Sequence, residues 1–153
     1  MPPHLVMRDV RETDLTVLFE HQNDPEASRM AAHPSREHDA FMIHWAKILA
    51  DDSTTKRVIL LDGEVAGSVV AFSVGGRRMV GYWIGREYWG RGLATAGLAA
   101  LLEGEPERPL YAYVAKHNRG SIRVLQKNGF QECDGAALGM PLEDYELLLT
   151  LPA

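Results

Sequence analysis

The chain has 153 residues, of which 46% are hydrophobic, and its 21 acidic and 16 basic side chains give a formal net charge of -5. This length and apolar content fit one globular domain, residues 1–153, with a sizeable core, and leave little room for a second domain. The acidic balance argues against a nucleic-acid surface, and no apolar run approaches the ~20 residues that a membrane-spanning helix needs.

The N-terminal half predicts one strand, two helices and three further strands. In chain order they are a strand at 4–8, helices at 14–20 and 35–50, and strands at 56–61, 65–74 and 77–84. Asp14 would cap the first helix, and Trp45 belongs to a stripe of apolar side chains on the second. Asp62-Gly63 and Gly75-Gly76 are strong signals for tight hairpins, so the three later strands are expected to be antiparallel.

The C-terminal half predicts two helices placed between strands. The elements are a helix from Gly92 to about 103, a strand at 110–115, a short helix after Asn118, and strands at 130–138 and 145–151. The strand-helix-strand crossover is expected to be parallel and right-handed. Asn118 is a natural N-cap, Gly129 suits the left-handed residue after the helix, and Phe130 can fold back onto Leu125.

A glycine-bearing turn leads from the strand that ends at Ile84 into the helix after Gly92. The first turn of a helix has backbone N–H groups without intrahelical partners, and the helix dipole adds partial positive charge there. The segment therefore predicts a site for an anion such as phosphate. The glycine pair alone is equally explained by the needs of the turn itself.

Spacing excludes a Walker loop and argues against a dinucleotide fingerprint. A Walker loop needs Gly-Lys-Ser/Thr, whereas Gly92 is followed by Leu93-Ala94-Thr95. A dinucleotide fingerprint needs a third glycine or alanine where Thr95 stands and an acidic residue about 20 positions later, where the chain reads Leu-Tyr-Ala-Tyr-Val.

The segment Trp89-Gly90-Arg91-Gly92-Leu93-Ala94 resembles the pyrophosphate-binding signature of the GNAT N-acetyltransferase superfamily. That signature has Gln or Arg, two variable residues, Gly, one variable residue, then Gly or Ala, and Trp89 stands at its first position. Tyr-Trp-Gly-Arg-Gly followed by a small residue and Thr is similar to the branch that contains ribosomal-protein-alanine N-acetyltransferases. A second block, with Asn118, Ser121 and a closing Asn-Gly-Phe, resembles the superfamily's segment beside the pantetheine arm.

The resemblance implies an α+β fold with a mixed, mostly antiparallel central sheet of about seven strands flanked by about four helices. It also implies that the strands at 77–84 and 110–115 splay apart to form a slot for acetyl-CoA. The residues expected to bind this cofactor are Trp83, Ile84, Gly85, Trp89, Gly90, Arg91, Gly92, Leu93, Ala94, Thr95, Asn118 and Ser121. Arg91 offers charge to a phosphate or is simply solvated, and Arg123 and Lys127 either meet the 3′-phosphate or form a charged outer face.

The implied activity is transfer of an acetyl group from acetyl-CoA to a primary amine, by direct attack through a tetrahedral intermediate. The acceptor would be a small-molecule amine or a protein or peptide N-terminus. Ser121 is expected to donate a proton to the leaving thiolate, with Asn118 ordering its turn. The alternative for Ser121 is a first-turn serine that bonds its own backbone.

The sequence does not identify which residue acts as the general base. Relatives commonly carry a glutamate two residues before the Gly-Tyr pair, and Met79 stands there. His117, or Tyr82 or Tyr113 through ordered water, are the substitutes. Without a base, the alternative function is a non-catalytic acyl-CoA binding or sensing module.

The remaining expectations concern the surroundings of the protein. The single Cys133 and an N-terminus without signal-peptide features indicate a reducing cytoplasm. No metal site is expected, since His33, His38 and His44 fit a polar surface or substrate wall better. Analogy with relatives suggests a homodimer that pairs through the strand at 145–151.

Overall fold

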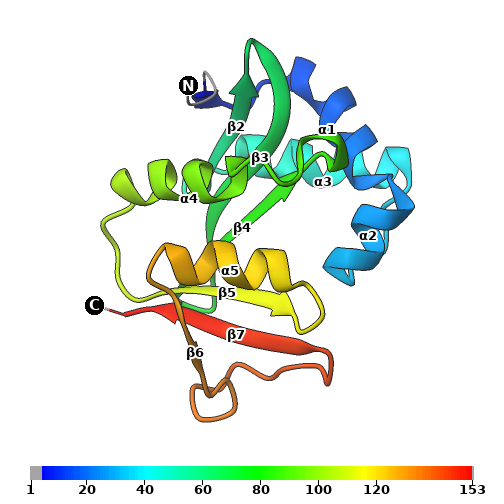
Figure 1. Ribbon diagram of the computed structural model, residues 1–153. Coiled ribbons are helices and arrows are strands. Elements are labelled where there is room, and N and C mark those ends of the chain that lie inside the picture. Colours follow the sequence, from blue (N-terminus) through cyan, green and yellow to red (C-terminus); the bar gives the residue numbers. More distant parts are fainter. Residues whose placement is uncertain (1–4, 153) are drawn as a thin grey trace.

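The computed structural model describes residues 5–152, and its sheet has seven strands in the order β1-β2-β3-β4-β5-β7-β6 (Figure 1). The strands are β1 (Leu5–Asp9), β2 (Thr55–Leu61), β3 (Glu64–Val74), β4 (Arg77–Ile84), β5 (Leu110–Ala115), β6 (Gln131–Cys133) and β7 (Glu146–Leu151). The helices are α1 (Leu15–Gln22), α2 (Pro25–Ala31), α3 (His38–Ala50), α4 (Leu93–Glu103) and α5 (Arg119–Lys127), with short 3-10 turns η1 (Glu12–Asp14) and η2 (Arg86–Tyr88). The predicted α+β architecture is confirmed. His4, the predicted start of the first strand, lies outside the described residues.

Both predicted hairpins are present. β2 pairs antiparallel with β3, and β3 pairs antiparallel with β4. Asp62-Gly63 and Gly75-Gly76 all have positive φ, as tight hairpin turns of the primed type require. These local signals fix the register of the central strands.

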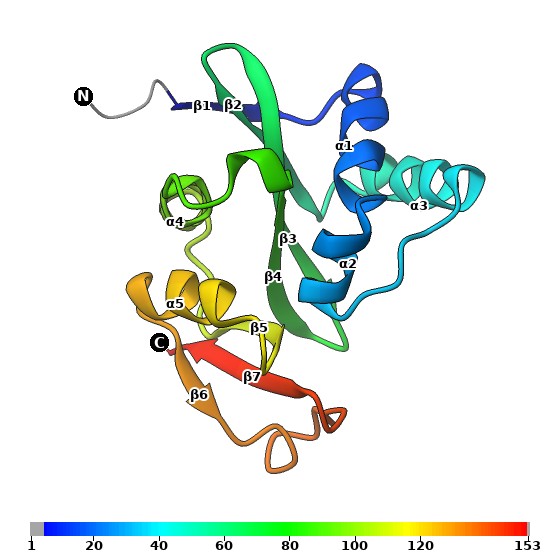
Figure 2. The ribbon, with the colours of Figure 1, turned by 45° about the vertical axis from the view of Figure 1, so that its right-hand side comes forward.

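β4 and β5 run parallel and are paired at one end only. Their ladder contains Arg78 opposite Leu110 and Met79 opposite Tyr111, and the remaining residues of both strands are unpaired with each other. Figure 2 shows the strands running apart beyond this point, with α4 and α5 on one side of the sheet and α1 to α3 on the other. This is the slot that the family resemblance implies.

Apolar side chains form a core on each face of the sheet. Leu98 of α4 and Leu125 of α5 are at most 1% exposed and pack on Val69 and Leu110 of the strands. On the other face, Trp45 of α3 is buried in a second core, as its helical stripe predicts. Each such side chain contributes about 1.5–3 kcal/mol when it is fully buried.

Three elements differ from the sequence-based expectation. The helix α2 was not predicted, although the Asp24 side chain accepts a hydrogen bond from the Glu26 N–H and Pro25 starts the helix. The helix predicted at 35–50 begins at His38, because Glu37 is extended. The strand predicted at 130–138 is wrong beyond Cys133, where the chain enters turns closed by a hydrogen bond from the Met140 N–H to the Gly135 carbonyl.

Among residues 5–152, no helix combines the length and the apolar character needed to cross a membrane.

Candidate functional site

The turn between β4 and α4 presents a run of free backbone donors. Gly90 and Gly92 have φ values of 77° and 75°, which L-residues with side chains rarely adopt. The first helical hydrogen bond runs from the Ala96 N–H to the Gly92 carbonyl, and no N–H from Gly90 through Thr95 donates to an acceptor within residues 5–152. A Cβ at Gly90 or Gly92 would meet nothing within 4 Å, so a ligand can approach this backbone closely.

Two tryptophans hold the turn in place. The Trp89 indole N–H donates to the Ile84 carbonyl at 2.9 Å, which ties the turn to the end of β4. The Trp83 indole N–H donates to the His21 carbonyl at 3.1 Å, which ties β4 to α1. Trp89 therefore braces the turn, and Trp83 anchors the end of β4 to α1.

A cavity of ≈ 600 Å³ extends from this turn to the start of α5. The predicted site residues that line it are Trp83, Ile84, Trp89, Gly90, Gly92, Leu93, Ala94, Thr95, His117, Asn118 and Ser121. The sequence thus identified most of one continuous cleft, from segments that lie on the strand β4, the helices α4 and α5 and the two turns that precede these helices.

Gly85 and Arg91 do not line the cleft. Gly85 is buried beside His21, and a Cβ at this position would come within 2.7 Å of the imidazole ring. The Arg91 guanidinium lies over the Tyr88 ring, 5.8 Å from its centroid. The close approach that requires glycine at 85 is therefore made by a side chain of α1.

Several cleft residues were not singled out by the sequence reasoning. Ala27, Met30 and Ala31 of α2 form an apolar wall. The signal for this wall was Asp24-Pro25, a cap and a helix start that precede it. Arg119 was missed as well, and it adds positive charge beside Arg123 and Lys127, the residues considered above for the 3′-phosphate. No acidic side chain among residues 5–152 lines the cleft, so its charge suits a phosphorylated ligand.

Tyr82 and Ser121 meet inside the cleft. The Tyr82 hydroxyl lies 2.5 Å from Ser121 Oγ and 3.0 Å from the Ser121 carbonyl oxygen. Asn118 accepts a hydrogen bond from the Ser121 N–H at 3.2 Å, so the predicted cap of α5 is confirmed. Burial raises the pKa of Tyr82 to about 12, against a smaller lowering by its bond to Ser121, so the phenol is neutral near pH 7.

The substitutes for a general base lie in different surroundings. His117 Nε2 lies 2.9 Å from the Arg29 carbonyl oxygen, and because a carbonyl only accepts, this nitrogen carries the proton and Nδ1 is the basic atom. Tyr113 is 41% exposed and lies outside the cleft. Met79 packs in an apolar cluster with Tyr111, Met140 and Leu148, away from the cleft.

Two of the histidines near α3 contact different aromatic rings. His33 contacts the Trp83 ring edge-on, whereas His38 contacts Phe19. No group of three or more His, Cys, Asp or Glu in the described part of the chain is arranged to hold a metal ion.

Comparison with known proteins gives one family and many similar folds. The family model for the acetyltransferase (GNAT) domain matches residues 4–131. A search of curated proteins gave no match.

Three solved structures illustrate the similarity of fold. A domain from Methanocaldococcus jannaschii has a TM-score of 0.82 and 16% identity, with 99% of each chain covered. The aminoglycoside acetyltransferase AAC(6')-Ib in complex with coenzyme A and kanamycin has a TM-score of 0.75 and 21% identity, over 97% of this chain and 94% of that one. A spermidine N-acetyltransferase chimera from Vibrio cholerae and hSSAT has a TM-score of 0.76 and 15% identity, over 97% and 95%.

Proposed function

The chain belongs to the GNAT acetyltransferase family, whose members use acetyl-CoA, and we propose that it transfers the acetyl group to a primary amine by direct attack. The observation that carries this proposal is that Gly90 and residues 92–95, whose N–H groups are free, line the same cavity as the Tyr82–Ser121 pair. The first feature suits a diphosphate and the second suits proton transfer. Together they match the diphosphate and the thioester of an acyl-CoA.

Different residues of the chain would bind different parts of the cofactor. The backbone donors from Gly90 to Thr95, with the dipole of α4 behind them, would hold the diphosphate. Arg123 and Lys127 line the same cleft and supply charge for a further phosphate. Beyond Met79, the edge of β4 facing the slot has no strand partner on β5, so its backbone is free to bond the amides of the pantetheine arm.

The Tyr82–Ser121 pair would handle the proton of the leaving group. Acetyl-CoA supplies the activated thioester, and its sulfur leaves as a thiolate that needs a proton. Ser121 donates its hydroxyl proton to the thiolate, and the Tyr82 hydroxyl, 2.5 Å away, gives a proton to Ser121 Oγ. Solvent in the cleft then reprotonates Tyr82 before the next turnover. We assign the proton lost by the attacking amine to Nδ1 of His117, since Nε2 is held by the Arg29 carbonyl.

For the acceptor, we propose a protein or peptide N-terminus, as the branch resemblance suggests. The wall formed by Ala27, Met30 and Ala31 is apolar, and residues 5–152 contribute no carboxylate to the cleft for a polycation. A peptide N-terminus needs only one amine to be accommodated, and its first side chain can contact the apolar wall. Kanamycin and spermidine carry several ammonium groups that would have no acidic partner in this cleft.

The test is an assay of acceptor-dependent thiol release over a panel of peptides, kanamycin and spermidine. We expect turnover with peptides and little with the two polycations. Cofactor binding without thiol release for any acceptor would favour the alternative of a sensing module, and preferred turnover of a polycation would overturn the acceptor assignment.

Replacement of Ser121 tests the proton-transfer step. We expect Ser121→Ala to lower kcat by about 100-fold, within the range typical of general acid catalysis, and to change the Kd for acetyl-CoA less than about threefold. Ser121→Thr keeps a hydroxyl and should recover part of kcat. Unchanged turnover in the alanine variant would remove Ser121 from the mechanism.

A further inference from the structure

The side chain of Asn128 joins the two helices that form walls of the cofactor cleft. Its amide nitrogen, Nδ2, donates to the Thr95 carbonyl of α4 at 3.2 Å and to the Val124 carbonyl of α5 at 3.1 Å. Thr95 and Val124 both line the cleft, whereas Asn128 is not among the lining residues. Within residues 5–152, no other hydrogen bond joins α4 to α5 or to the residue that caps it.

The backbone does not by itself require asparagine at position 128. Asn128 ends α5 with a φ of -95°, which any residue adopts, and the left-handed residue is Gly129, with a φ of 92°. Both partners of the side chain are carbonyl oxygens, which only accept. The primary amide of asparagine has two N–H groups, so it can bond both carbonyls at once. The residue type therefore fits a bridge between the helices.

Each carbonyl that Asn128 bonds belongs to a residue beside a different part of the proposed site. The Thr95 N–H is one of the free donors that would hold the diphosphate. Val124 lies one turn after Ser121 on the same face of α5, and Ser121 contacts Tyr82. The two bonds of Asn128 therefore tie the turn proposed for the diphosphate to the helix that carries the serine proposed for the thioester end.

We propose that Asn128 is a positioning residue that sets the spacing of α4 and α5 for coenzyme A without touching the cofactor, an inference that rests on the placement of the cofactor in the proposed function. A ligand that engages both helices binds more weakly when their spacing varies, because the contact with one helix no longer favours the contact with the other. A ligand that engages only the turn before α4 keeps its contacts.

The test compares coenzyme A with ADP, in the wild type and in Asn128→Leu, which has a side chain of similar size without a donor. ADP carries a diphosphate but neither the 3′-phosphate nor the pantetheine arm, so it is the ligand for the turn before α4 alone. Amide NMR titrations followed at residues 92–95 give both Kd values. We expect Asn128→Leu to raise the Kd for coenzyme A at least about tenfold and the Kd for ADP less than about threefold.

Asn23 provides a matched control. It ends α1 with a φ of -80°, and its side-chain oxygen accepts a hydrogen bond from Ser35 Oγ at 3.0 Å, away from the cleft. Asn23→Leu should leave both Kd values unchanged. Asn128→Gln keeps the primary amide and should recover part of the affinity for coenzyme A. Asn128→Ala, which adds no bulk, carries the same expectation as Asn128→Leu and replaces it if that variant does not fold.

The ratio of the two Kd values decides the role of Asn128. An equal rise in both, or no rise in either, would overturn the proposal, since a purely structural loss does not distinguish the two ligands. Gly92→Ala checks the proposed function separately, because it should weaken the binding of both ligands. If Gly92→Ala weakens neither, the diphosphate site is wrong, whereas an unchanged ratio in Asn128→Leu alone leaves that site standing.

Discussion

At the scale of single residues, the chemistry depends on a contact between Tyr82 and Ser121. A tyrosine hydroxyl has one proton, and here it faces both the Ser121 carbonyl and Ser121 Oγ. When it donates to Oγ, the serine proton is free to point into the cleft, toward the atom that needs it. The pair therefore forms a donor chain whose inner member is protected from solvent by burial.

The titration of Tyr82 can be measured directly. Burial disfavours the phenolate and raises the pKa of Tyr82 to about 12, whereas the unfolded value is about 10. Near pH 11, folded wild type and folded Tyr82→Phe should therefore show nearly equal tyrosinate absorbance. In denaturant at the same pH they should differ by one tyrosinate.

The same shift has a consequence for stability. The pKa is raised by folding, so the contribution of Tyr82 is fully present below about pH 10 and is lost as the pH rises through about 12. A difference of nearly one tyrosinate between the folded proteins near pH 11 would show that the phenol is not shielded as described.

At the scale of elements, the segments with local signals at both ends were the predictable ones. The helix α5 has its Asn118 cap, and it ends with the Phe130 N–H bonded to the Leu125 carbonyl at 3.0 Å beyond Gly129, as the sequence predicted. The seven-residue helix α2 has only one buried residue, Ala27. Its sequence therefore has no apolar stripe from which the helix could be predicted. The contact between Tyr82 and Ser121 joins residues that are 39 positions apart in the sequence. No local sequence pattern predicts a contact between residues so far apart along the chain.

The glycine turn before α4 allows a test with a closely matched control. Gly92 and Gly76 both have positive φ, 75° and 79°, and a Cβ at either would meet nothing within 4 Å. Alanine at either position should destabilise the protein by about 1 kcal/mol, because the left-handed conformation is strained. Only Gly92→Ala should also raise the Kd for acetyl-CoA, by more than about tenfold, since only that turn presents free donors.

Calorimetric Kd values and urea unfolding of the two variants make this comparison. Equal cofactor affinity in both variants would show that the turn does not hold the diphosphate, whatever their stabilities.

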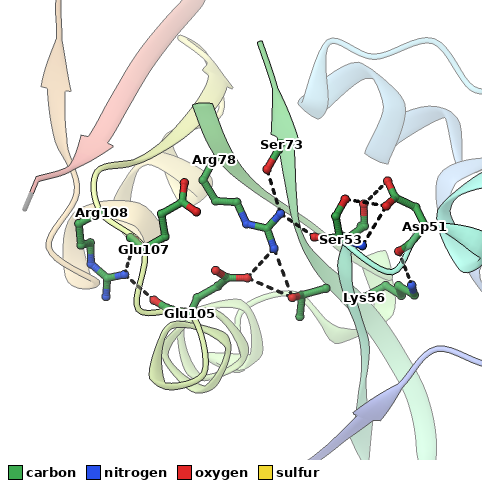
Figure 3. A network of polar contacts seen from close by, with 10 residues as sticks. Asp51, Ser53, Lys56, Ser73, Arg78, Glu105, Glu107 and Arg108 are labelled. Atoms are coloured by element: carbon green, nitrogen blue, oxygen red, sulfur yellow. Dashed lines mark hydrogen bonds and ion pairs between the residues drawn. The ribbon is translucent and has the colours of Figure 1, made fainter. Parts of the chain in front are cut away.

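At the scale of the whole molecule, a buried ion pair closes the narrow end of the slot. Figure 3 shows Arg78 of β4 meeting Glu105, which follows α4, with the pair 2.7 Å apart. The Arg78 guanidinium also donates to the Ser53 carbonyl at 2.7 Å and to Ser73 Oγ at 3.2 Å. Arg78 is one of the two β4 residues that pair with β5, and its side-chain network ties this end of β4 to β3, to the start of β2 and to the segment after α4.

Removing one partner of this pair should weaken the whole fold. Glu105→Gln leaves the Arg78 guanidinium buried without a counter-charge, which costs about 3–5 kcal/mol when a buried pair is broken in this way. Glu107→Gln, two residues further and exposed, is the matched control and should change the free energy of unfolding by less than about 0.5 kcal/mol. Urea unfolding near pH 7 measures both.

The pH dependence of that loss identifies its electrostatic part. Burial by itself raises the pKa of Glu105, but hydrogen bonds from Arg78 and Thr55 outweigh it and lower the pKa below its usual value. Stability from a carboxylate with a lowered pKa is present above the unfolded value, about 4.3, and disappears as the pH falls through the folded value. The gap between wild type and Glu105→Gln should therefore be constant from about pH 7 to pH 5 and shrink in more acidic solution. A gap that stayed the same to the acid limit would mean that Glu105 acts through its shape and hydrogen bonds, and that its charge does not hold the slot closed.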